Sequence, residues 1–396
     1  MRILQVAASY WPAVRYGGTI VSVHGLAKAL AARGHDVHVF TTSVDGPADS
    51  PVPHGTPVAV DGVTVWYFQS RHLRRWYWAP SLGWSLRRRI REFDVVHTHA
   101  IYLWPLWAAA RQARAAGVPY VVSPRGMLEK ELIESKSALV KAALIGFIER
   151  RNLEGASAIH VTSQREADGA LKFGFNLPPL FRIPNGVELD PGGGAEPSPA
   201  VRALAAAGPF VLFLGRINWK KGIDRLIAAL AHAPSLRLVL AGNDEDGDQR
   251  GFEQRAAALG VTARMTFAGP VHGADKYALL RLATVLVLPS YSENFGNVVL
   301  EAMAVGCPVV VTPEVGIAEI VAETHAGWVV DGTAAALGET LNTIVGNPAL
   351  GVEAGAHGRA AVRESFTWDR VAEQMERVYQ QAADRARPQG AAATSA

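Results

Sequence analysis

A strand, a glycine-rich loop, a helix and a second strand follow one another twice in the chain, about 200 residues apart. The first copy starts with an apolar run at residues 3–8 and continues through Gly17 and Gly18, and the second runs from residues 210–214 into the loop 215–222. Units of this kind build parallel sheets that are covered by helices on both faces. Because 396 residues exceed one ordinary hydrophobic core, we expect two doubly wound α/β domains in tandem.

The stretch between the two copies, residues 183–199, reads I-P-N-G-V-E-L-D-P-G-G-G-A-E-P-S-P. Its glycine, proline and aspartate content is typical of a linker. We therefore place an N-terminal domain at residues 1–184 and a C-terminal domain at residues 185–365. The sequence also predicts one long C-terminal helix over residues 363–385, and a disordered tail at residues 388–396.

The composition limits the function classes. Hydrophobic residues make up 49% and charged residues 19% of the chain, which is a globular and not a disordered composition. The net charge of +3 suits anionic ligands or a membrane surface and is too small to indicate nucleic acid. The single cysteine, Cys307, excludes an internal disulfide framework and suits a reducing compartment. No apolar run reaches the ~18 residues of a transmembrane helix, and the N-terminus lacks a signal-peptide pattern, so we expect a cytoplasmic protein.

The loop G-R-I-N-W-K-K-G lies between a predicted strand and a predicted helix at residues 215–222. Its cations, Arg216, Lys220 and Lys221, stand just ahead of the helix start. Cations together with exposed backbone N–H groups form a site for anions such as phosphate. Taken alone, the loop is equally compatible with a solvated basic turn.

The stretch S-E-N-F-G-N-V-V-L-E follows the predicted strand at residues 285–288 and carries Glu293 and Glu301, eight residues apart. Gly296 permits close approach of the backbone to a ligand, and a helix is predicted over residues 297–305, whose first N–H groups suit phosphate. The two carboxylates suit vicinal hydroxyls of a sugar or a ribose. The alternative is that both glutamates are solvated, since glutamate near a helix start is favoured by the helix dipole.

The stretch Y-G-G-T after the first strand, residues 16–19, is not G-x-G-x-x-G, so the fingerprint of a dinucleotide site is absent from its usual place. The stretch D-V-V-H-T-H ends a predicted strand at His99. Paired histidines can bind zinc, but no further ligands follow at metal spacing, and we favour a hydrogen-bonding role.

The stretch N-D-E-D-G-D contains the Asp-x-Asp pattern by which many metal-dependent sugar transferases hold a cation. It lacks the spacing of a calcium loop, because the sixth position from Asp244 is Gln249 and not glycine. We interpret Asp244 to Asp248 as a solvated acidic loop and keep a metal-dependent transferase as the rival hypothesis.

From Arg71 to Arg91, basic residues alternate with tryptophan and tyrosine. This pattern is found in RNA-binding segments and equally in segments that lie on an anionic membrane. The simplest alternative is a mobile basic loop and helix face. We expect contact with an anionic membrane surface and no nucleic acid.

These motifs together resemble glycosyltransferase family 4, whose members are retaining enzymes of the GT-B fold, over nearly the whole chain. The resemblance rests on E-x7-E from Glu293 to Glu301, G-R-x4-K-G in the loop 215–222, the pair Gly17 and Gly18, the following R-G-H-D-V, and the linker P-N-G-V. Within this family the chain resembles transferases of the bacterial envelope and of exopolysaccharides. It implies two Rossmann-like domains facing a cleft, the first for the acceptor and the second for the nucleotide-sugar donor.

The resemblance further implies that the C-terminal helix, residues 366–387, crosses back onto the N-terminal domain. It assigns the donor diphosphate to Arg216 and Lys221, the nucleotide ribose to Glu301, and the hydroxyls of the donor sugar to Glu293. Backbone groups at the helix start would reach the sugar and the phosphates, and these belong to Phe295, Gly296, Asn297 and Val298.

The glycine pair Gly17 and Gly18 would bring the N-terminal domain onto the diphosphate, and Gly242 and Val271 would line the base pocket. One departure concerns the acceptor side. Many family members have histidine in a pattern like T-x-H-G, whereas this chain reads S-P-R-G with Arg125. A guanidinium can bind the donor phosphate or an acidic acceptor, but it stays charged and is a poor proton shuttle.

We therefore assign His99 and Arg125 to the acceptor side and expect a retaining transferase that uses a UDP- or GDP-sugar. No metal or other cofactor is expected. Because no enzyme nucleophile is evident, the resemblance favours front-face attack, with Glu293 as a sugar clamp. A lipid-linked saccharide in polysaccharide or envelope glycan synthesis is the expected acceptor. The other classes left open are an epimerase or phosphorylase of the same fold and a non-catalytic bilobal sugar-binding protein.

Overall fold

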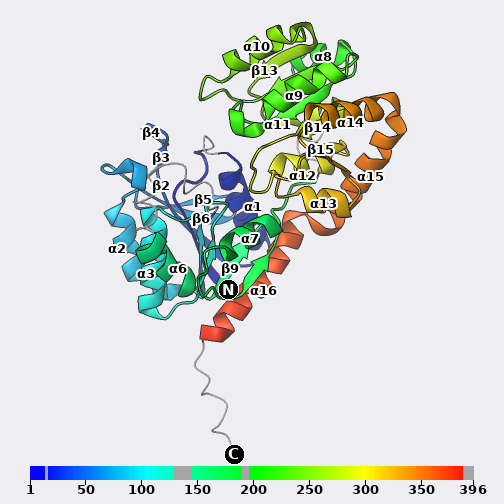
Figure 1. Ribbon diagram of the computed structural model, residues 1–396. Coiled ribbons are helices and arrows are strands. Elements are labelled where there is room, and N and C mark those ends of the chain that lie inside the picture. The colour runs from blue at the N-terminus through cyan, green and yellow to red at the C-terminus, as the bar shows by residue number, and fades with distance from the viewer. Residues whose placement is uncertain (14–16, 129–144, 190–195, 387–396) are drawn as a thin grey trace, which may run out of the picture. The chain divides into compact units, whose positions relative to one another are not determined.

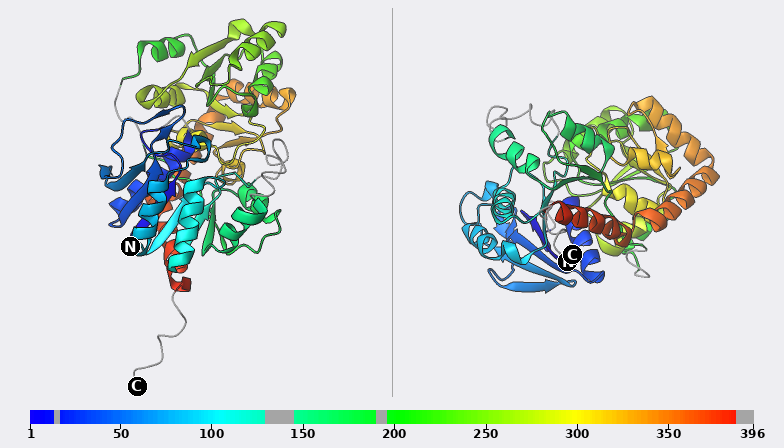
Figure 2. Two further views of the ribbon diagram at one scale, coloured as in Figure 1. Left: turned by 90° about the vertical axis from the view of Figure 1, so that its left-hand side faces the viewer. Right: turned by 90° about the horizontal axis from the view of Figure 1, so that it is seen from below.

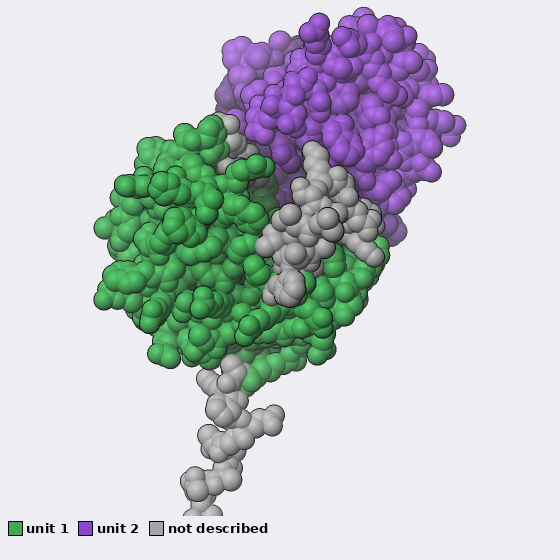
Figure 3. Space-filling view, turned by 60° about the vertical axis from the view of Figure 1, so that its left-hand side comes forward, with its two compact units in different colours: residues 1–186, 368–396 green, residues 187–367 purple. Residues whose placement is uncertain are grey.

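The computed structural model describes residues 1–13, 17–128, 145–189 and 196–386. The chain forms two compact units, coloured separately in Figure 3. Unit 1 comprises Met1–Gly186 and Trp368–Ala396, and unit 2 comprises Val187–Thr367. Each unit has its own parallel sheet and its own hydrophobic core. The predicted pair of doubly wound α/β domains is therefore confirmed.

The sheet of unit 1 has the strand order β10-β9-β8-β7-β1-β2-β6-β5 and is parallel except for β5, which runs antiparallel to β6. Every residue of β7 is buried, as expected for a strand covered on both faces. The strands of this sheet, with the small pair β3 and β4, are β1 (Arg2–Ala7), β2 (Asp36–Thr42), β3 (Val44–Asp45), β4 (Ala48–Asp49), β5 (Pro57–Val60), β6 (Val63–Phe68), β7 (Val95–His99), β8 (Tyr120–Ser123), β9 (Ala158–Val161) and β10 (Leu180–Arg182).

Helices cover both faces of this sheet (Figure 1). They are α1 (Gly18–Ala32), α2 (Pro80–Arg89), α3 (Trp104–Ala116), α6 (Arg150–Glu154), α7 (Gln164–Leu171) and α16 (Trp368–Ala386), with the short turns η2 (Arg74–Trp76), η3 (Ile90–Glu92) and η4 (Ile145–Glu149). Helices α2 and α3 pack on one face, and α1 and α16 on the other.

The C-terminal helix α16 packs along α1 and against β7 and β8 (Figures 1 and 2). Its buried side chains recur at helical spacing, which turns one apolar stripe towards the sheet. These side chains are Val371, Ala372, Met375, Val378, Tyr379 and Ala382. The expectation that the C-terminal helix returns to the N-terminal domain is confirmed.

The sheet of unit 2 is entirely parallel and has the order β13-β12-β11-β14-β15-β16. Its strands are β11 (Val211–Leu214), β12 (Leu238–Ala241), β13 (Met265–Gly269), β14 (Val285–Leu288), β15 (Val309–Val311) and β16 (Gly327–Val329). Its helices and short turns are α8 (Pro199–Ala206), η5 (Trp219–Lys221), α9 (Ile223–Ala229), η6 (Leu230–His232), α10 (Gln249–Ala258), η7 (Thr262–Arg264), α11 (Gly273–Leu282), α12 (Asn297–Ala304), α13 (Ala318–Glu323), α14 (Ala334–Gly346) and α15 (Pro348–Ser365).

One prediction of secondary structure is wrong. The helix expected over residues 363–385 is two helices, because α15 ends at Ser365 and α16 begins at Trp368. The linker interrupts the helical pattern: the N–H of Val187 donates to the carbonyl of Phe366 at 2.9 Å, and Val187 pairs with Thr367 as an isolated bridge. Bonds to the linker thus replace helical bonds where the chain passes from unit 2 back to unit 1.

The boundaries between the units fall two residues after the predicted ones, which stood after residues 184 and 365. The predicted tail, residues 388–396, and Tyr16 of the stretch Y-G-G-T lie outside the described residues. Within the described ranges, no helix combines the length and the apolar character needed to cross a bilayer.

Candidate active site

The donor residues predicted from the sequence lie at the carboxyl edge of the unit 2 sheet. The strand order reverses between β11 and β14, and such switch points are where open α/β sheets bind ligands. Two loops leave the sheet here, which we call the β11 loop (residues 215–222) and the β14 loop (residues 289–296). The backbone N–H of Tyr291 donates to the carbonyl of Lys220 at 2.8 Å and so joins the two loops directly.

Glycines permit the close contacts between these loops. Gly222 has a φ of 66°, and a Cβ there would lie 2.0 Å from the carbonyl oxygen of Pro289 in the β14 loop. Gly242, at the end of β12, is similarly restricted, because its Cβ would lie 1.7 Å from the carbonyl oxygen of Gly215. Only glycine lets two backbones approach this closely. A side chain at Gly222 would separate the two loops, and one at Gly242 would separate the end of β12 from the β11 loop.

Lys221 and Glu293 meet where the two loops join. The Lys221 ammonium donates directly to a carboxylate oxygen of Glu293, and the two side chains are 17% and 21% exposed. The two sequence motifs therefore contribute to a single site, 72 residues apart in sequence. An ammonium beside a carboxylate at the edge of a sheet can bind a phosphate with one group and sugar hydroxyls with the other.

The second glutamate of the motif also has a lysine partner. Glu301 lies in α12 and accepts a hydrogen bond of 2.9 Å from the Nζ of Lys276 in α11. Burial lowers the pKa of Lys276, but the charges of Glu301 and Tyr277 and the hydrogen bonds to both together outweigh it, so that the pKa lies above its ordinary value. The interpretation of Glu301 as a simply solvated residue is therefore wrong. No local pattern in the sequence pointed to Lys276.

The start of α12 is held in place by the loop after β15. The N–H of Glu293 donates to the carbonyl of Glu314 at 3.2 Å, and the N–H of Ile317 donates to the carbonyl of Phe295 at 2.9 Å. Gly296 follows in the left-handed region, with a φ of 97°, and α12 begins at Asn297 as predicted. The sequence analysis missed the role of this loop, although its P-E-V-G stretch directly after a strand was a signal.

The remaining donor residues follow neighbouring strands at the same edge. Arg216 is exposed directly after β11 and forms no ion pair with any described residue. The N–H of Gly242 donates to the carbonyl of Gly269 at 2.8 Å, which fixes the ends of β12 and β13 together. Val271 comes two residues after β13 and packs partly buried against the core. Val298 packs against the same core from the first turn of α12.

The acidic loop Asp244 to Asp248 supports backbone structure. Asp244 accepts hydrogen bonds from the N–H groups of Asp248 and Gln249 at 2.9 and 3.3 Å, where α10 begins. Asp248 accepts from the N–H of Trp219 at 3.0 Å. Among the described residues, no group of three or more histidine, cysteine, aspartate or glutamate side chains is placed to hold a metal.

The predicted residues of the N-terminal domain lie at the carboxyl edge of the unit 1 sheet. Gly17, with a φ of 75°, precedes α1, which begins at Gly18. His99 ends β7 and is 2% exposed, and Arg125 follows β8 by two residues. The guanidinium of Arg125 donates to Oδ1 of Asn185 at 2.8 Å and to Nδ1 of His99 at 3.2 Å. Burial and the charge of Arg125 hold the pKa of His99 well below its ordinary value, so this imidazole is neutral.

A buried chain of hydrogen bonds lies beside His99, beneath α16. Its links are Tyr379 to His97 Nδ1 at 2.7 Å, His97 Nε2 to Ser123 at 2.6 Å, Ser123 to His160 Nδ1 at 2.7 Å, and His160 Nε2 to the carbonyl of Ile183 at 2.9 Å. Burial lowers the pKa of His97 strongly and that of His160 to about 3, so both rings are neutral.

The direction of every bond in this chain follows from its last link. A carbonyl only accepts, so His160 donates from Nε2, and its Nδ1 must accept from the Ser123 hydroxyl. Ser123 then accepts from Nε2 of His97, and Nδ1 of His97 accepts from the Tyr379 hydroxyl. The chain thereby ties α16 to three neighbouring strands and to the start of the linker. The sequence analysis anticipated a hydrogen-bonding role for the histidines of β7 but not these partners.

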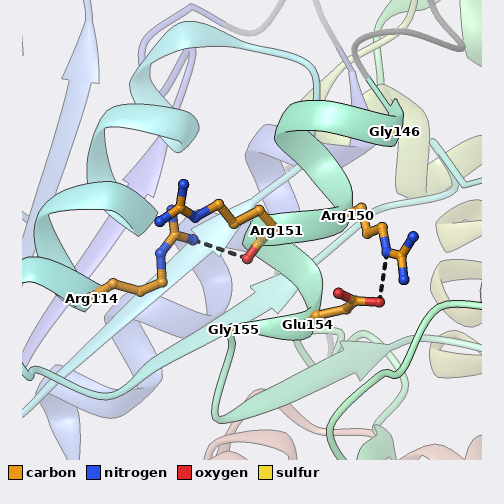
Figure 4. Close-up of a pocket in the computed structure, with 6 residues that line it drawn as sticks. All are labelled: Arg114, Gly146, Arg150, Arg151, Glu154 and Gly155. Carbon is orange, nitrogen blue, oxygen red and sulfur yellow. Dashed lines mark hydrogen bonds and ion pairs between the residues drawn. The ribbon is translucent and has the colours of Figure 1, made fainter.

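An open depression of about 390 Å³ in unit 1 contains none of the predicted site residues. It is lined by Arg114, Gly146, Arg150, Arg151, Glu154 and Gly155 (Figure 4). Arg114 donates to the carbonyl of Arg151 at 3.2 Å and to Asn152 at 2.9 Å, and Arg150 bonds to Glu154 at 2.9 Å. Two of its cations therefore hold α6 in place.

The segment from Arg71 to Arg91 forms η2 and α2. Helix α2 buries Leu82 and Leu86, and its outer face carries Arg87, Arg88 and Trp84, which is 58% exposed. The guanidinium of Arg88 stacks on the Trp84 ring at 3.9 Å from its centroid. Arg74 differs from these, because it bonds to Asp49 and to three backbone carbonyls. The basic segment is thus an ordered helix face, and Arg74 serves the structure rather than this face.

Two protein families match the chain. The family described as "Glycosyl transferase 4-like domain" matches residues 17–186, and "Glycosyl transferases group 1" matches residues 196–387. The chain is 30% identical over 392 residues to the D-inositol 3-phosphate glycosyltransferase of Xylanimonas cellulosilytica, covering 93% of each chain.

Solved structures share the fold. The sucrose-phosphate synthase of Thermosynechococcus elongatus superposes with a TM-score of 0.75 at 24% identity, covering 97% of this chain and 99% of that one. HepE of Anabaena, in complex with UDP and glucose, gives a TM-score of 0.72 at 22% identity, with coverage of 96% and 99%. The expected GT-B fold is confirmed. The chain belongs to the group 1 glycosyltransferases, and it is a glycosyltransferase enzyme.

Proposed function

We propose that this enzyme transfers a sugar from a nucleoside-diphosphate donor to an acceptor hydroxyl with retention of configuration. The observation that carries the proposal is the direct contact of Lys221 with Glu293 at the switch point of unit 2. The cation and the start of α12 suit a diphosphate, and the carboxylates of Glu293 and Glu301 suit the hydroxyls of the sugar and the ribose. The UDP complex of Anabaena HepE favours uracil over guanine as the base of the donor nucleotide.

The reaction requires stabilisation of the leaving nucleoside diphosphate. As the bond between the anomeric carbon and the phosphate oxygen breaks, charge grows on the diphosphate. Arg216, Lys221 and the N–H groups at the start of α12 are suited to stabilise that charge without a metal. The acceptor oxygen forms the new bond from the same face, and its proton passes to the departing phosphate. Glu293, bonded to Lys221, acts as a clamp on the sugar hydroxyls and not as the nucleophile.

The acceptor that we propose is a lipid-linked saccharide of polysaccharide or envelope glycan synthesis. The support is the outer face of α2, which presents Trp84 together with Arg87 and Arg88. An exposed tryptophan flanked by arginines suits the interface of an anionic membrane. We therefore place the enzyme at the inner face of the cytoplasmic membrane.

Thermal unfolding with UDP, GDP and ADP side by side tests the donor. We expect UDP to raise the midpoint most, since ligand binding stabilises the folded state. Turnover of UDP-sugars is then measured for Lys221→Ala and Glu301→Ala, with the exposed Arg111→Gln of α3 as the control. Both site variants should fold and lose at least about 100-fold in kcat/KM, as expected for losing one stabilising group. Near wild-type turnover in both, or activity that requires Mn²⁺ after EDTA treatment, would refute the proposal.

A further inference from the structure

The carboxyl edge of the unit 1 sheet holds a cation whose bonding partners are all neutral. Arg125 follows β8, His99 ends the neighbouring β7, and Asn185 follows β10 at the same edge. The guanidinium donates to the Asn185 amide oxygen and to the His99 ring. Neither partner carries charge, because an amide is neutral and the imidazole is unprotonated.

The charge of Glu166 favours the guanidinium of Arg125, but burial outweighs it and lowers the pKa of Arg125, and the two side chains form no ion pair. Glu166 bonds instead to backbone N–H groups, with 2.6 Å to Gly126 and 2.7 Å to Thr162, and it also accepts from the Thr162 hydroxyl at 2.9 Å. These bonds fix the loop that carries Arg125. Within the part of the chain that the structure describes, Arg125 forms no ion pair. A shielded charge without an opposite partner is unfavourable, and the unfavourable energy is removed when an anion binds.

Two N–H groups of this pair also lack acceptors. A guanidinium only donates, so Nδ1 of His99 accepts and the ring proton is on Nε2. This Nε2 and the Nε of Arg125 are both shielded from solvent, and neither has a hydrogen-bond partner among the described residues. Among the described residues, the site therefore presents one positive charge without an ion pair and two unused donors, and the His99 side chain is almost fully buried.

We propose that Arg125 and His99 bind a phosphate group of the acceptor and so determine which acceptors the enzyme uses. A phosphate matches the site because it brings negative charge and several oxygens for the fork of the guanidinium and for the imidazole N–H. The cations proposed for the donor diphosphate belong to unit 2, whereas all residues of this pair belong to unit 1. The inference rests on the proposed function, since it assigns the phosphate to the acceptor of sugar transfer.

The test is a calorimetric titration of the full-length protein with inorganic phosphate, with the donor site saturated by UDP. We expect wild type and the control Arg111→Gln to bind phosphate equally, and Arg125→Gln to bind it at least about tenfold more weakly. Arg125→Lys keeps the charge but loses the fork, so an intermediate loss is expected, and this variant decides the question if Arg125→Gln does not fold.

Two outcomes would overturn the inference. Phosphate affinity that is equal in wild type and both Arg125 variants would show that no such subsite exists. A loss of UDP affinity in Arg125→Gln beyond about twofold would show that the guanidinium serves the donor instead. A separate titration of wild type with UDP alone distinguishes failure of the donor assignment: without UDP binding the proposed function fails, whereas UDP binding without phosphate binding refutes only the acceptor subsite.

Discussion

Replacing Tyr379 with phenylalanine tests the buried hydrogen-bond chain under α16. In the structure, the Tyr379 hydroxyl donates to Nδ1 of His97 at 2.7 Å, and the other nitrogen of His97 is committed as a donor to Ser123. Removal of the hydroxyl therefore leaves Nδ1 as a buried acceptor without a donor. The apolar ring remains, so the packing of α16 on the sheet is unchanged.

The expected loss follows from this unsatisfied acceptor. A buried polar group that loses its partner costs about 1–3 kcal/mol, and we take about 2 kcal/mol for a nitrogen shielded on all sides. In a unit of roughly 200 residues, each kcal/mol lowers the midpoint by about 2–4 °C. Tyr379→Phe should therefore lower the Tm of unit 1 by about 4–8 °C. The transition of unit 2 should stay unchanged, because the helix belongs to unit 1.

Scanning calorimetry measures both transitions, and the chain offers a matched control. The hydroxyl of Tyr102 is buried and has no hydrogen-bond partner among the described residues, so Tyr102→Phe removes an unsatisfied group. This control should be neutral or slightly stabilising. If Tyr379→Phe shifts the midpoint no more than Tyr102→Phe, the buried hydrogen bond between Tyr379 and His97 does not stabilise unit 1 and the reasoning fails.

Three further predictions concern charge. Glu293→Gln should bind UDP as tightly as wild type or more tightly, because Lys221 is freed from its carboxylate, while turnover of the UDP-sugar falls. Weaker UDP binding in a calorimetric titration would contradict the role of Glu293 as a clamp on the sugar. Trp84→Ala combined with Arg88→Gln should lower co-sedimentation with anionic vesicles relative to Arg111→Gln, and equal retention of both would exclude α2 as the membrane face. His160 has its folded pKa lowered from 6.5 to about 3, so below pH 6.5 the unfolded state binds a proton that the folded state does not. Stability should thus fall by roughly 1–2 kcal/mol per pH unit between these values, and equal urea midpoints at pH 7 and pH 5 would contradict this.

The fold and the donor motifs were accessible from the sequence because their signals are local. Apolar runs of four to five residues followed by glycine and charged residues predicted the strand at residues 285–288 without error, and the helix after it begins at Asn297 as expected. A parallel α/β sheet then places every such loop at one edge. Because Lys221 and Glu293 each lie in a loop directly after a predicted strand, their positions in the sequence were enough to predict that both lie at the carboxyl edge of the sheet.

The partners of the site residues were not accessible, since each depends on a contact between distant segments. Lys276 stands 25 residues before Glu301, Asn185 stands 60 residues after Arg125, and Tyr379 stands 282 residues after His97. The prediction of one helix over residues 363–385 was wrong for a similar reason. Helical periodicity continues through residues 366 and 367, and the linker at Val187 competes for their backbone groups.

The carboxyl edges of the unit 1 and unit 2 sheets differ in whether their cations are paired with carboxylates, and this difference supports distinct ligands. In unit 2, Lys221 and Lys276 each bond to a carboxylate, so a diphosphate that binds Lys221 exchanges one anionic partner for another while Glu293 turns to the sugar hydroxyls. Such an exchange keeps Lys221 paired with an anion both with and without the donor. In unit 1, Arg125 has no carboxylate partner among the described residues, so an anionic ligand adds balance that the protein itself does not provide. Binding of the UDP-sugar should therefore depend on both members of the pair, on Lys221 through the diphosphate and on Glu293 through the sugar, whereas acceptor binding should depend on the charge of Arg125 itself.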